Sequence, residues 1–169
     1  MPDGASTTYA YSYYPSANTQ TATLSTRSKK TTQDGFGRTT KVETFHDGVP
    51  PPISIVDTQY AACACSPLGK VSQVSQPYAP GGTPVWTIYS YDGSGRTLKV
   101  TAPDGSKTQY AYQGNQTTVF DPTNPDKLTD ATHRWKTFTS DAFGNLLSPD
   151  SGQGSESRNP RSWNRCAHV

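Results

Sequence analysis

The chain has 169 residues, and Leu, Ile, Val and Phe together supply only 23 of them. This share lies below the roughly 20% at which a conventional aliphatic core becomes doubtful, so a large globular enzyme is excluded. The net charge of +2 does not hold the chain open, and 10 Tyr, 5 Phe and 3 Trp supply apolar surface for a β-sheet. Because Thr is abundant while Leu and Met are scarce, the composition favours an extended β-rich chain over a helical bundle.

An internal repeat begins at the N-terminus. Residues 2–11 and 103–112 both start with Pro-Asp-Gly and end with Tyr-Ala-Tyr, and Thr7 and Thr108 match between these ends. No basic segment followed by an apolar run precedes the first copy, so no signal peptide is expected. No stretch reaches the roughly 18 apolar residues of a membrane-spanning helix, so no membrane span is expected either.

Four short units with a glycine at the fourth position punctuate the chain. They are residues 34–39, 66–71, 92–97 and 141–146, with the glycines Gly37, Gly69, Gly95 and Gly144. In an Asp-x-x-Gly sequence the Asp side chain bonds its own backbone, and Gly adopts the positive φ that the turn requires. Each unit therefore predicts a turn, and the unit at 66–71, which starts with Ser, is a degenerate copy.

Alternating residues predict strands beside these turns. Residues 97–102 place Leu98 and Val100 on one face, which is the period of a half-buried strand. A Pro-Asp-Gly-Ser turn at 103–106 then reverses the chain, and a returning strand at 107–112 completes a β-hairpin. Further strands are expected at 39–45, 85–91 and 117–120. The predicted fold is all-β, an irregular ribbon of antiparallel β-hairpins without a substantial helix.

Residues 91–112 resemble an RHS repeat, also called a YD repeat. The Tyr-Asp-x-x-Gly-Arg core, the strand after it, the Pro-Asp-Gly turn and the Tyr-x-Tyr end all match, and weaker copies stand at 34–44 and 141–146. The resemblance covers about residues 2–148, and we expect residues 1–148 to form a partial repeat array. Residues 149–169 lack both turn spacing and alternation, so a disordered tail is predicted there.

The resemblance implies an architectural role for the residues that recur. Glycines are expected to form the turns, tyrosines to pack between hairpins, and the two arginines to bridge neighbouring turns. The residues are Gly37, Arg38, Tyr91, Asp92, Gly95, Arg96, Pro103, Asp104, Gly105, Tyr110, Tyr112, Asp141 and Gly144. In this family the hairpins form a hollow shell around the C-terminal part of the same polypeptide, often a toxin. The resemblance thus implies a fragment of a bacterial protein that is secreted or lies at the cell surface.

Catalytic and metal sites find little support in the sequence. A structural zinc site needs four ligands, and Cys63 and Cys65 would supply two of them. The remaining pair would be Cys166 and His168, about a hundred residues away. Three cysteines are an odd number and imply no closed disulfide framework. His133 could be drawn into a catalytic triad, but no nucleophile elbow or phosphate-binding glycine loop accompanies it. We therefore expect no enzyme, no cofactor and no metal.

The tyrosine pairs leave a second function open. Pairs at 9 and 11, 89 and 91, and 110 and 112 each lie on one face of a strand. Packing between hairpins, worth about 0.2–1 kcal/mol per pair, is favoured because the pairs recur with the repeat. The alternative is a carbohydrate- or protein-binding adhesin module that uses exposed Tyr and Trp. Scattered charges argue against a nucleic-acid partner. The expected partners are neighbouring repeats of the same or a parent polypeptide and an encapsulated effector.

Overall fold

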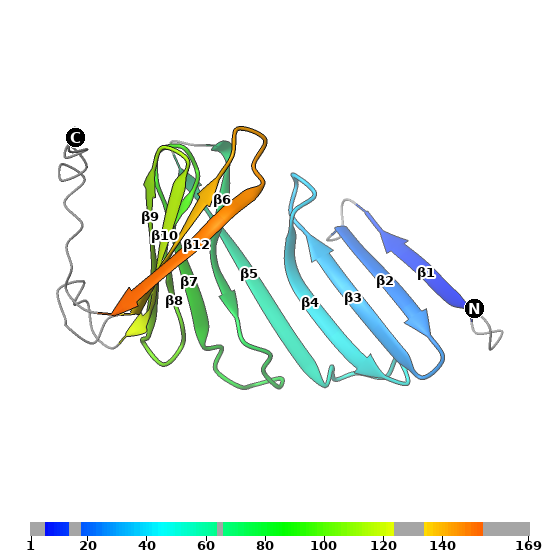
Figure 1. The fold of residues 1–169 in the computed structure, drawn as a ribbon. Coiled ribbons are helices and arrows are strands. Elements are labelled where there is room, and N and C mark those ends of the chain that lie inside the picture. The colour runs from blue at the N-terminus through cyan, green and yellow to red at the C-terminus, as the bar shows by residue number, and fades with distance from the viewer. Residues whose placement is uncertain (1–5, 14–17, 64–65, 124–133, 154–169) are drawn as a thin grey trace, which may run out of the picture. The chain divides into compact units, whose positions relative to one another are not determined.

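The computed structural model describes residues 6–13, 18–63, 66–123 and 134–153, which form twelve β-strands and no helix (Figure 1). The strands are β1 (Thr7–Ser12), β2 (Asn18–Leu24), β3 (Arg27–Gln33), β4 (Thr39–His46), β5 (Ser54–Cys63), β6 (Ser66–Ser75), β7 (Trp86–Tyr91), β8 (Thr97–Thr101), β9 (Lys107–Gln113), β10 (Gln116–Thr123), β11 (Arg134–Ser140) and β12 (Leu146–Gln153). The all-β prediction is confirmed. Within the described ranges, no helix is long and apolar enough to cross a membrane.

Strand order in the sheet follows the order of the chain, from β1 to β12. Each recorded pairing between neighbouring strands is antiparallel, as expected when short turns join consecutive strands. The chain divides into two compact units, Met1–Thr97 and Leu98–Val169. The first unit holds β1 to β7, and the second holds β9 to β12 with nearly all of β8.

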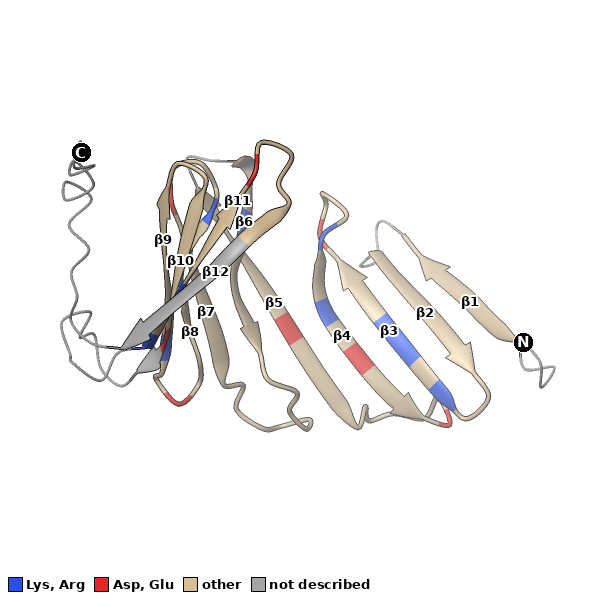
Figure 2. Cartoon of the chain, in the orientation of Figure 1, with Lys and Arg blue, Asp and Glu red and all other residues tan. Residues whose placement is uncertain are grey.

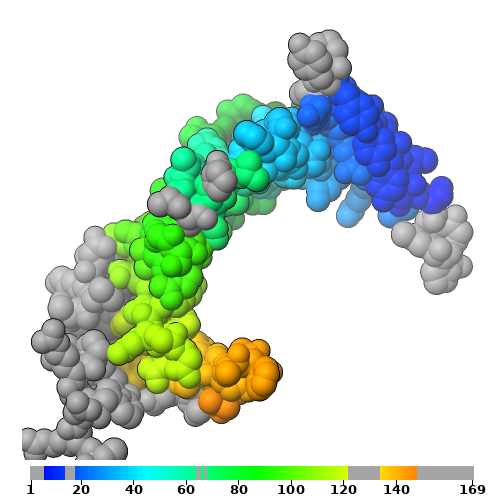
Figure 3. Space-filling view, turned by 90° about the horizontal axis from the view of Figure 1, so that it is seen from above, coloured from blue at the N-terminus to red at the C-terminus, as the bar shows by residue number. Residues whose placement is uncertain are grey.

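Each unit is one sheet thick, which leaves little room for a core (Figure 3). Among the described residues, Ile55 and Trp135 are the buried apolar side chains, and Ser28 and Ser75 are the buried polar ones. The expected half-buried face of 97–102 is realised in part, because Val100 and Ala102 are half-buried but Leu98 is 40% exposed. A single layer has no second layer to cover either face, so most residues are half-buried and sparse aliphatic content is enough.

The predicted turn at 66–71 is wrong. These residues lie in β6, which pairs with β5 with irregular register on both sides of Tyr60 and Ala61. Gly69 keeps the positive φ of 74° that the sequence predicted for it. Positive φ with a register shift describes a β-bulge, which replaces the expected turn.

The array also continues past the predicted boundary at residue 148, because β12 extends to Gln153. The rest of the predicted tail, residues 154–169, lies outside the described residues. Elsewhere the expected strands are found, with β4 at 39–46, β7 at 86–91, and β8 and β9 on either side of the turn at 103–106.

Candidate functional site

Three turns share one hydrogen-bonding pattern, centred on Asp34, Asp92 and Asp141. The carboxylate Oδ1 of Asp34 accepts the backbone N–H groups of Phe36 at 2.9 Å and Arg38 at 3.0 Å. The other two aspartates accept the N–H groups two and four positions later at 2.8–2.9 Å. The glycine in each turn has a φ of 77°, 81° or 86° and donates its N–H to the aspartate carbonyl. One turn design is therefore used three times among the described residues.

The second carboxylate oxygen in each turn holds the side chain that enters the next strand. Asp34 Oδ2 accepts Arg38 Nε at 2.7 Å, and Asp92 Oδ2 accepts Arg96 Nε at 2.7 Å. In the third turn Asn145 takes this position and donates its Nδ2 to Asp141 Oδ2 at 2.9 Å. The sequence predicts that the two arginines bridge neighbouring turns. In the structure each arginine bonds the aspartate of its own turn.

The turn at 103–106 keeps the backbone geometry with a different side-chain arrangement. Gly105 N–H donates to the carbonyl of Ala102, and Ala102 N–H donates to the carbonyl of Ser106. Asp104, which follows Pro103, accepts both the N–H of Ser106 at 2.9 Å and its hydroxyl at 2.7 Å. Here the aspartate bonds forward from the middle of the turn, since Ala occupies the first position.

These hydrogen bonds lower the pKa of all four turn aspartates below the ordinary value of 3.8. For Asp34, desolvation raises the pKa, but hydrogen bonds from Arg38 and Phe36 outweigh it. For Asp92 the largest cause is the backbone N–H of Arg96, and for Asp141 it is the side chain of Asn145. Each donor favours the ionised carboxylate.

Acid is therefore expected to unfold the turns. Because the folded pKa values lie below the unfolded ones, the stabilisation is complete above about pH 4 and is lost as the pH falls through the folded values. The free energy of unfolding, measured by urea titration from pH 7 to pH 2.5, should fall along this acid limb. A variant with Asn at 34, 92 and 141 should show a flatter limb, because an amide accepts N–H groups without titrating. An unchanged acid limb would contradict this assignment.

Consecutive strands of the first unit are joined by a contact that we call a tyrosine clasp. It has three parts, and the first example joins β4 to β5 and β6. The guanidinium carbon of Arg38 lies 4.3 Å from the ring centroid of Tyr60, and the Tyr60 hydroxyl donates to the carbonyl of Thr39 at 3.0 Å. Arg38 Nη1 also donates to the carbonyl of Leu68. Arg38 thus links its own turn to the next hairpin.

The second clasp repeats these parts one hairpin later. Lys70 Nζ lies 4.9 Å from the ring centroid of Tyr91, and the Tyr91 hydroxyl donates to the carbonyl of Val71 at 2.8 Å. Lys70 Nζ also donates to the carbonyl of Gly95 at 2.6 Å. In both clasps the tyrosine therefore bonds the residue that directly follows the basic one. Partial burial is the main cause of the raised pKa of Tyr91.

The second clasp should show measurable coupling. In a double-mutant cycle of Lys70→Ala and Tyr91→Leu, we expect an interaction energy of about 0.5–1 kcal/mol, the range for a partly exposed cation over an aromatic ring. Pairing Lys70→Ala with Tyr9→Leu is the control, because Tyr9 lies on β1 and is exposed. The losses in free energy of unfolding, measured by urea titration, should add up for the control pair but not for Lys70 and Tyr91. Additive losses in both pairs would contradict the second clasp.

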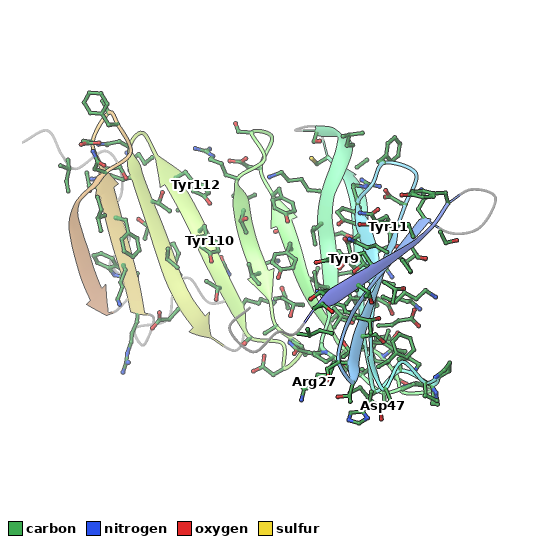
Figure 4. All side chains as sticks on the ribbon, turned by 90° about the vertical axis from the view of Figure 1, so that its right-hand side faces the viewer. Tyr9, Tyr11, Arg27, Asp47, Tyr110 and Tyr112 are labelled. Carbon is green, nitrogen blue, oxygen red and sulfur yellow. The ribbon has the colours of Figure 1, made fainter. Side chains whose placement is uncertain are left out.

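The tyrosine pairs of the two repeat copies differ in exposure (Figure 4). Tyr110 and Tyr112 on β9 are half-buried, whereas Tyr9 and Tyr11 on β1 are 58% and 56% exposed. Tyr11 stacks on Tyr13, with ring centroids 6.3 Å apart and an interplanar angle of 7°. The Tyr-Ala-Tyr sequence is therefore half-buried on β9, inside the array, and exposed to solvent on β1.

Basic and acidic residues lie on neighbouring strands of the first unit (Figure 2), and ion pairs form between these strands. Lys30 Nζ lies 3.6 Å from Glu43 Oε2, and Lys41 Nζ lies 3.6 Å from Asp57 Oδ1. The Tyr78 hydroxyl donates to Asp57 Oδ2, and this hydrogen bond raises the pKa of Tyr78. These charged groups therefore pair with one another or with Tyr78.

The sequence candidates for a metal or catalytic site fall partly within the described residues. Among the described residues, no three His, Cys, Asp or Glu side chains converge as metal ligands. Cys63 is disulfide-bonded, which the sequence did not predict, and His46 Nδ1 lies 2.8 Å from the neighbouring carboxylate of Asp47. His133, Cys65 and the pair at 166 and 168 lie outside the described residues.

A pocket of about 360 Å³ lies beside the second clasp. Its lining includes Lys70, Tyr89, Tyr91 and Asp92, together with small residues of β5. Lys70 Nζ already donates to the carbonyl of Gly95, and Asp92 already accepts the N–H groups of its own turn. The charged groups of this pocket therefore complete the contact between hairpins.

The comparison with known families matches the segment that contains the repeat at 91–112. Residues 80–124 match the family model of the RHS Repeat. The match begins before β7, spans the turns at Asp92 and Pro103, and reaches the end of β10. No curated protein matches the chain at a significant level.

Proposed function

We propose that the chain is a wall segment of an RHS shell, because residues 80–124 match the RHS Repeat, a family of structural repeats. In the parent polypeptide this wall encloses or presents a C-terminal effector, and the parent acts outside the cell or at its surface. The segment itself carries out no reaction. Its partners are the neighbouring repeats and the enclosed effector.

The observation that carries this proposal is the recurrence of linking contacts. The turn of Asp34 leads through Arg38 to Tyr60, and the bulge of β6 leads through Lys70 to Tyr91. Each hairpin therefore supplies part of the contact that holds the next one, which is the energetic pattern of a repeat array. An enzyme would instead concentrate its polar groups at one place.

A wall also needs two different faces, and the first unit has them. Lys41 pairs with Asp57 across the strands, and Val42 pairs with Val56 one residue later. Successive residues of a strand point to opposite faces. The ion pair therefore lies on one face, while Val56 lies on the other face together with Tyr60, which stands four residues later in β5. The first face is charged, and the second carries the clasps.

Limited proteolysis of the parent polypeptide tests the proposal. The region C-terminal to this segment should resist protease in the wild type and become cleavable in Gly95→Val, which breaks a turn of the wall. The matched control is Gly95→Asn, since Asn tolerates positive φ. A C-terminal region that is cleaved equally in all three proteins would overturn the enclosing role.

One observation favours an adhesin as a second candidate. Tyr9 and Tyr11 on β1 and Tyr13 directly after it form an exposed aromatic stripe, and Tyr13 is 68% exposed. Such a stripe is able to stack on a sugar ring. A glycan array with wild type and with Tyr9→Ala and Tyr11→Ala decides this. Binding that is lost while the free energy of unfolding is unchanged would support recognition, and no bound glycan would remove this candidate.

A further inference from the structure

Strand β1 lies at one end of the strand order and offers an open edge (Figures 1 and 4). In the part of the chain that the structure describes, β1 pairs with β2 alone. An open edge presents unpaired backbone groups that can bind another strand. Strand β1 also carries the exposed Tyr9 and Tyr11, and the exposed Tyr13 follows it directly.

Tyr11 lies on the same face as the clasps of the first unit. The pairings place Tyr11 opposite Gln20, Gln20 opposite Thr31, and Thr31 opposite Val42. Residues directly opposite across a sheet share a face, and residues four apart in one strand share it too. Val42 pairs with Val56, and Tyr60 stands four residues after Val56 in β5, so Tyr11 lies on the face where Arg38 covers the Tyr60 ring.

Tyr11 also has a hydrogen bond to give. Its hydroxyl oxygen accepts Gln20 Nε2 at 3.3 Å, which leaves the hydroxyl proton available. In the clasps, Tyr60 and Tyr91 use that proton to bond a carbonyl of the preceding strand. Tyr11 therefore has the ring, the face and the donor of a clasp, and half of its surface is exposed.

We propose that the edge of β1 is a docking site for a strand that enters from an Asp-x-x-Gly turn followed by Arg or Lys. The strand pairs antiparallel to β1, its cation covers the ring of Tyr11, and the Tyr11 hydroxyl donates to the carbonyl after the cation. This partner strand is one from another RHS repeat, so the inference rests on the proposed wall function and names the chemistry by which the wall is extended.

A second copy of this chain fits the site poorly. Its strand at the opposite end of the order is β12, which follows the turn at Asp141. The residue that enters β12 is Asn145, whose amide carries no positive charge to place over an aromatic ring. The observed clasps use Arg38 and Lys70 at that step. The occupant is therefore a strand with a basic residue.

A labelled peptide tests the site on the full chain. The probe is a fluorescent peptide of residues 34–45, which holds the Asp34 turn, Arg38 and the β4 strand, titrated by anisotropy. The Arg38→Ala peptide should bind roughly 2- to 30-fold more weakly, while Arg38→Lys should bind within a few-fold of the original. In the chain, Tyr11→Ala should match the peptide loss, and Tyr11→Phe should lose about 5-fold.

The control chain is Phe143→Ala, which removes an aromatic side chain that is 91% exposed in the second unit. It should bind the peptide as the wild type does. Equal affinity of the Arg38→Ala peptide, unchanged binding by Tyr11→Ala, or no binding would each overturn the proposal. Displacement of the peptide by self-association at rising chain concentration would overturn it in favour of a second copy. A failed titration leaves the proteolysis result on the parent intact, so the two proposals fail separately.

Discussion

Gly69→Ala is expected to destabilise the chain by about 3 kcal/mol, near the upper end of single substitutions. Two effects add at this position. The backbone has a φ of 74°, and an added Cβ would stand 2.5 Å from the carbonyl oxygen of Ala61 and 3.0 Å from its carbon. Backbone atoms of the paired strand cannot rotate aside, so β5 and β6 must separate. Urea unfolding followed by far-UV circular dichroism measures the loss.

Gly81→Ala separates the two effects. Gly81 has a φ of 78°, but an added Cβ would meet nothing within 4 Å. This variant should therefore lose only the cost of positive φ, about 1–2 kcal/mol. Equal losses in free energy of unfolding in both variants would show that the close approach of Ala61 adds no cost. That result would contradict the bulge at Gly69.

Gly95→Val is expected to lose about 2–3 kcal/mol and to disrupt the turn that joins β7 to β8. The φ of 81° is strained for every side chain with a Cβ and most of all for a β-branched one. The Gly95 carbonyl also accepts Lys70 Nζ, so a shifted turn weakens the second clasp. The same urea titration reports the change.

The matched variant is Gly95→Asn, which should lose less than about 1 kcal/mol because Asn visits the left-handed region readily. If valine and asparagine gave the same free energy of unfolding, the positive φ at this position would have no role. If circular dichroism and melting of Gly95→Val matched the wild type, the turn assignment itself would be wrong.

The turns were predictable because their information is local. Asp34, Asp92 and Asp141 each stand three residues before a glycine, and side chain and backbone bond within five residues. The strands that flank these turns followed from alternation. The same reasoning failed at Ser66, where the pattern is similar but no aspartate carboxylate is present to bond the backbone, and a strand with a bulge forms instead.

Other strands gave no clear pattern. β2 and β3 consist largely of Thr, Gln, Lys and Ser, without alternation of apolar and polar residues. In a single-layer sheet both faces remain half-exposed, so selection for one apolar face is weak. The high β-propensity of Thr was the available signal. The exposure of Leu98 has the same origin, since alternation predicts opposite faces but not what covers them.

The clasps could not be read from the sequence, because they depend on strand register. Tyr60 does not precede an aspartate as Tyr91 does, and it meets Arg38 only through the pairing of β4 with β5. Lys70 belongs to the degenerate unit at 66–71, yet its positive charge is what the second clasp shares with the first. Sequence reasoning thus found the tyrosines and basic residues but not which ones meet.

Hydrogen exchange measured by NMR on the full chain tests most directly whether one turn design builds the whole array. Protection is expected for the amides two and four positions after Asp34, Asp92 and Asp141, because each donates to a carboxylate. The amides one position after these aspartates should exchange rapidly. Similar protection in all three turns is the predicted result. Protection at Asp92 alone, inside the family match at 80–124, would contradict a repeat that extends along the chain.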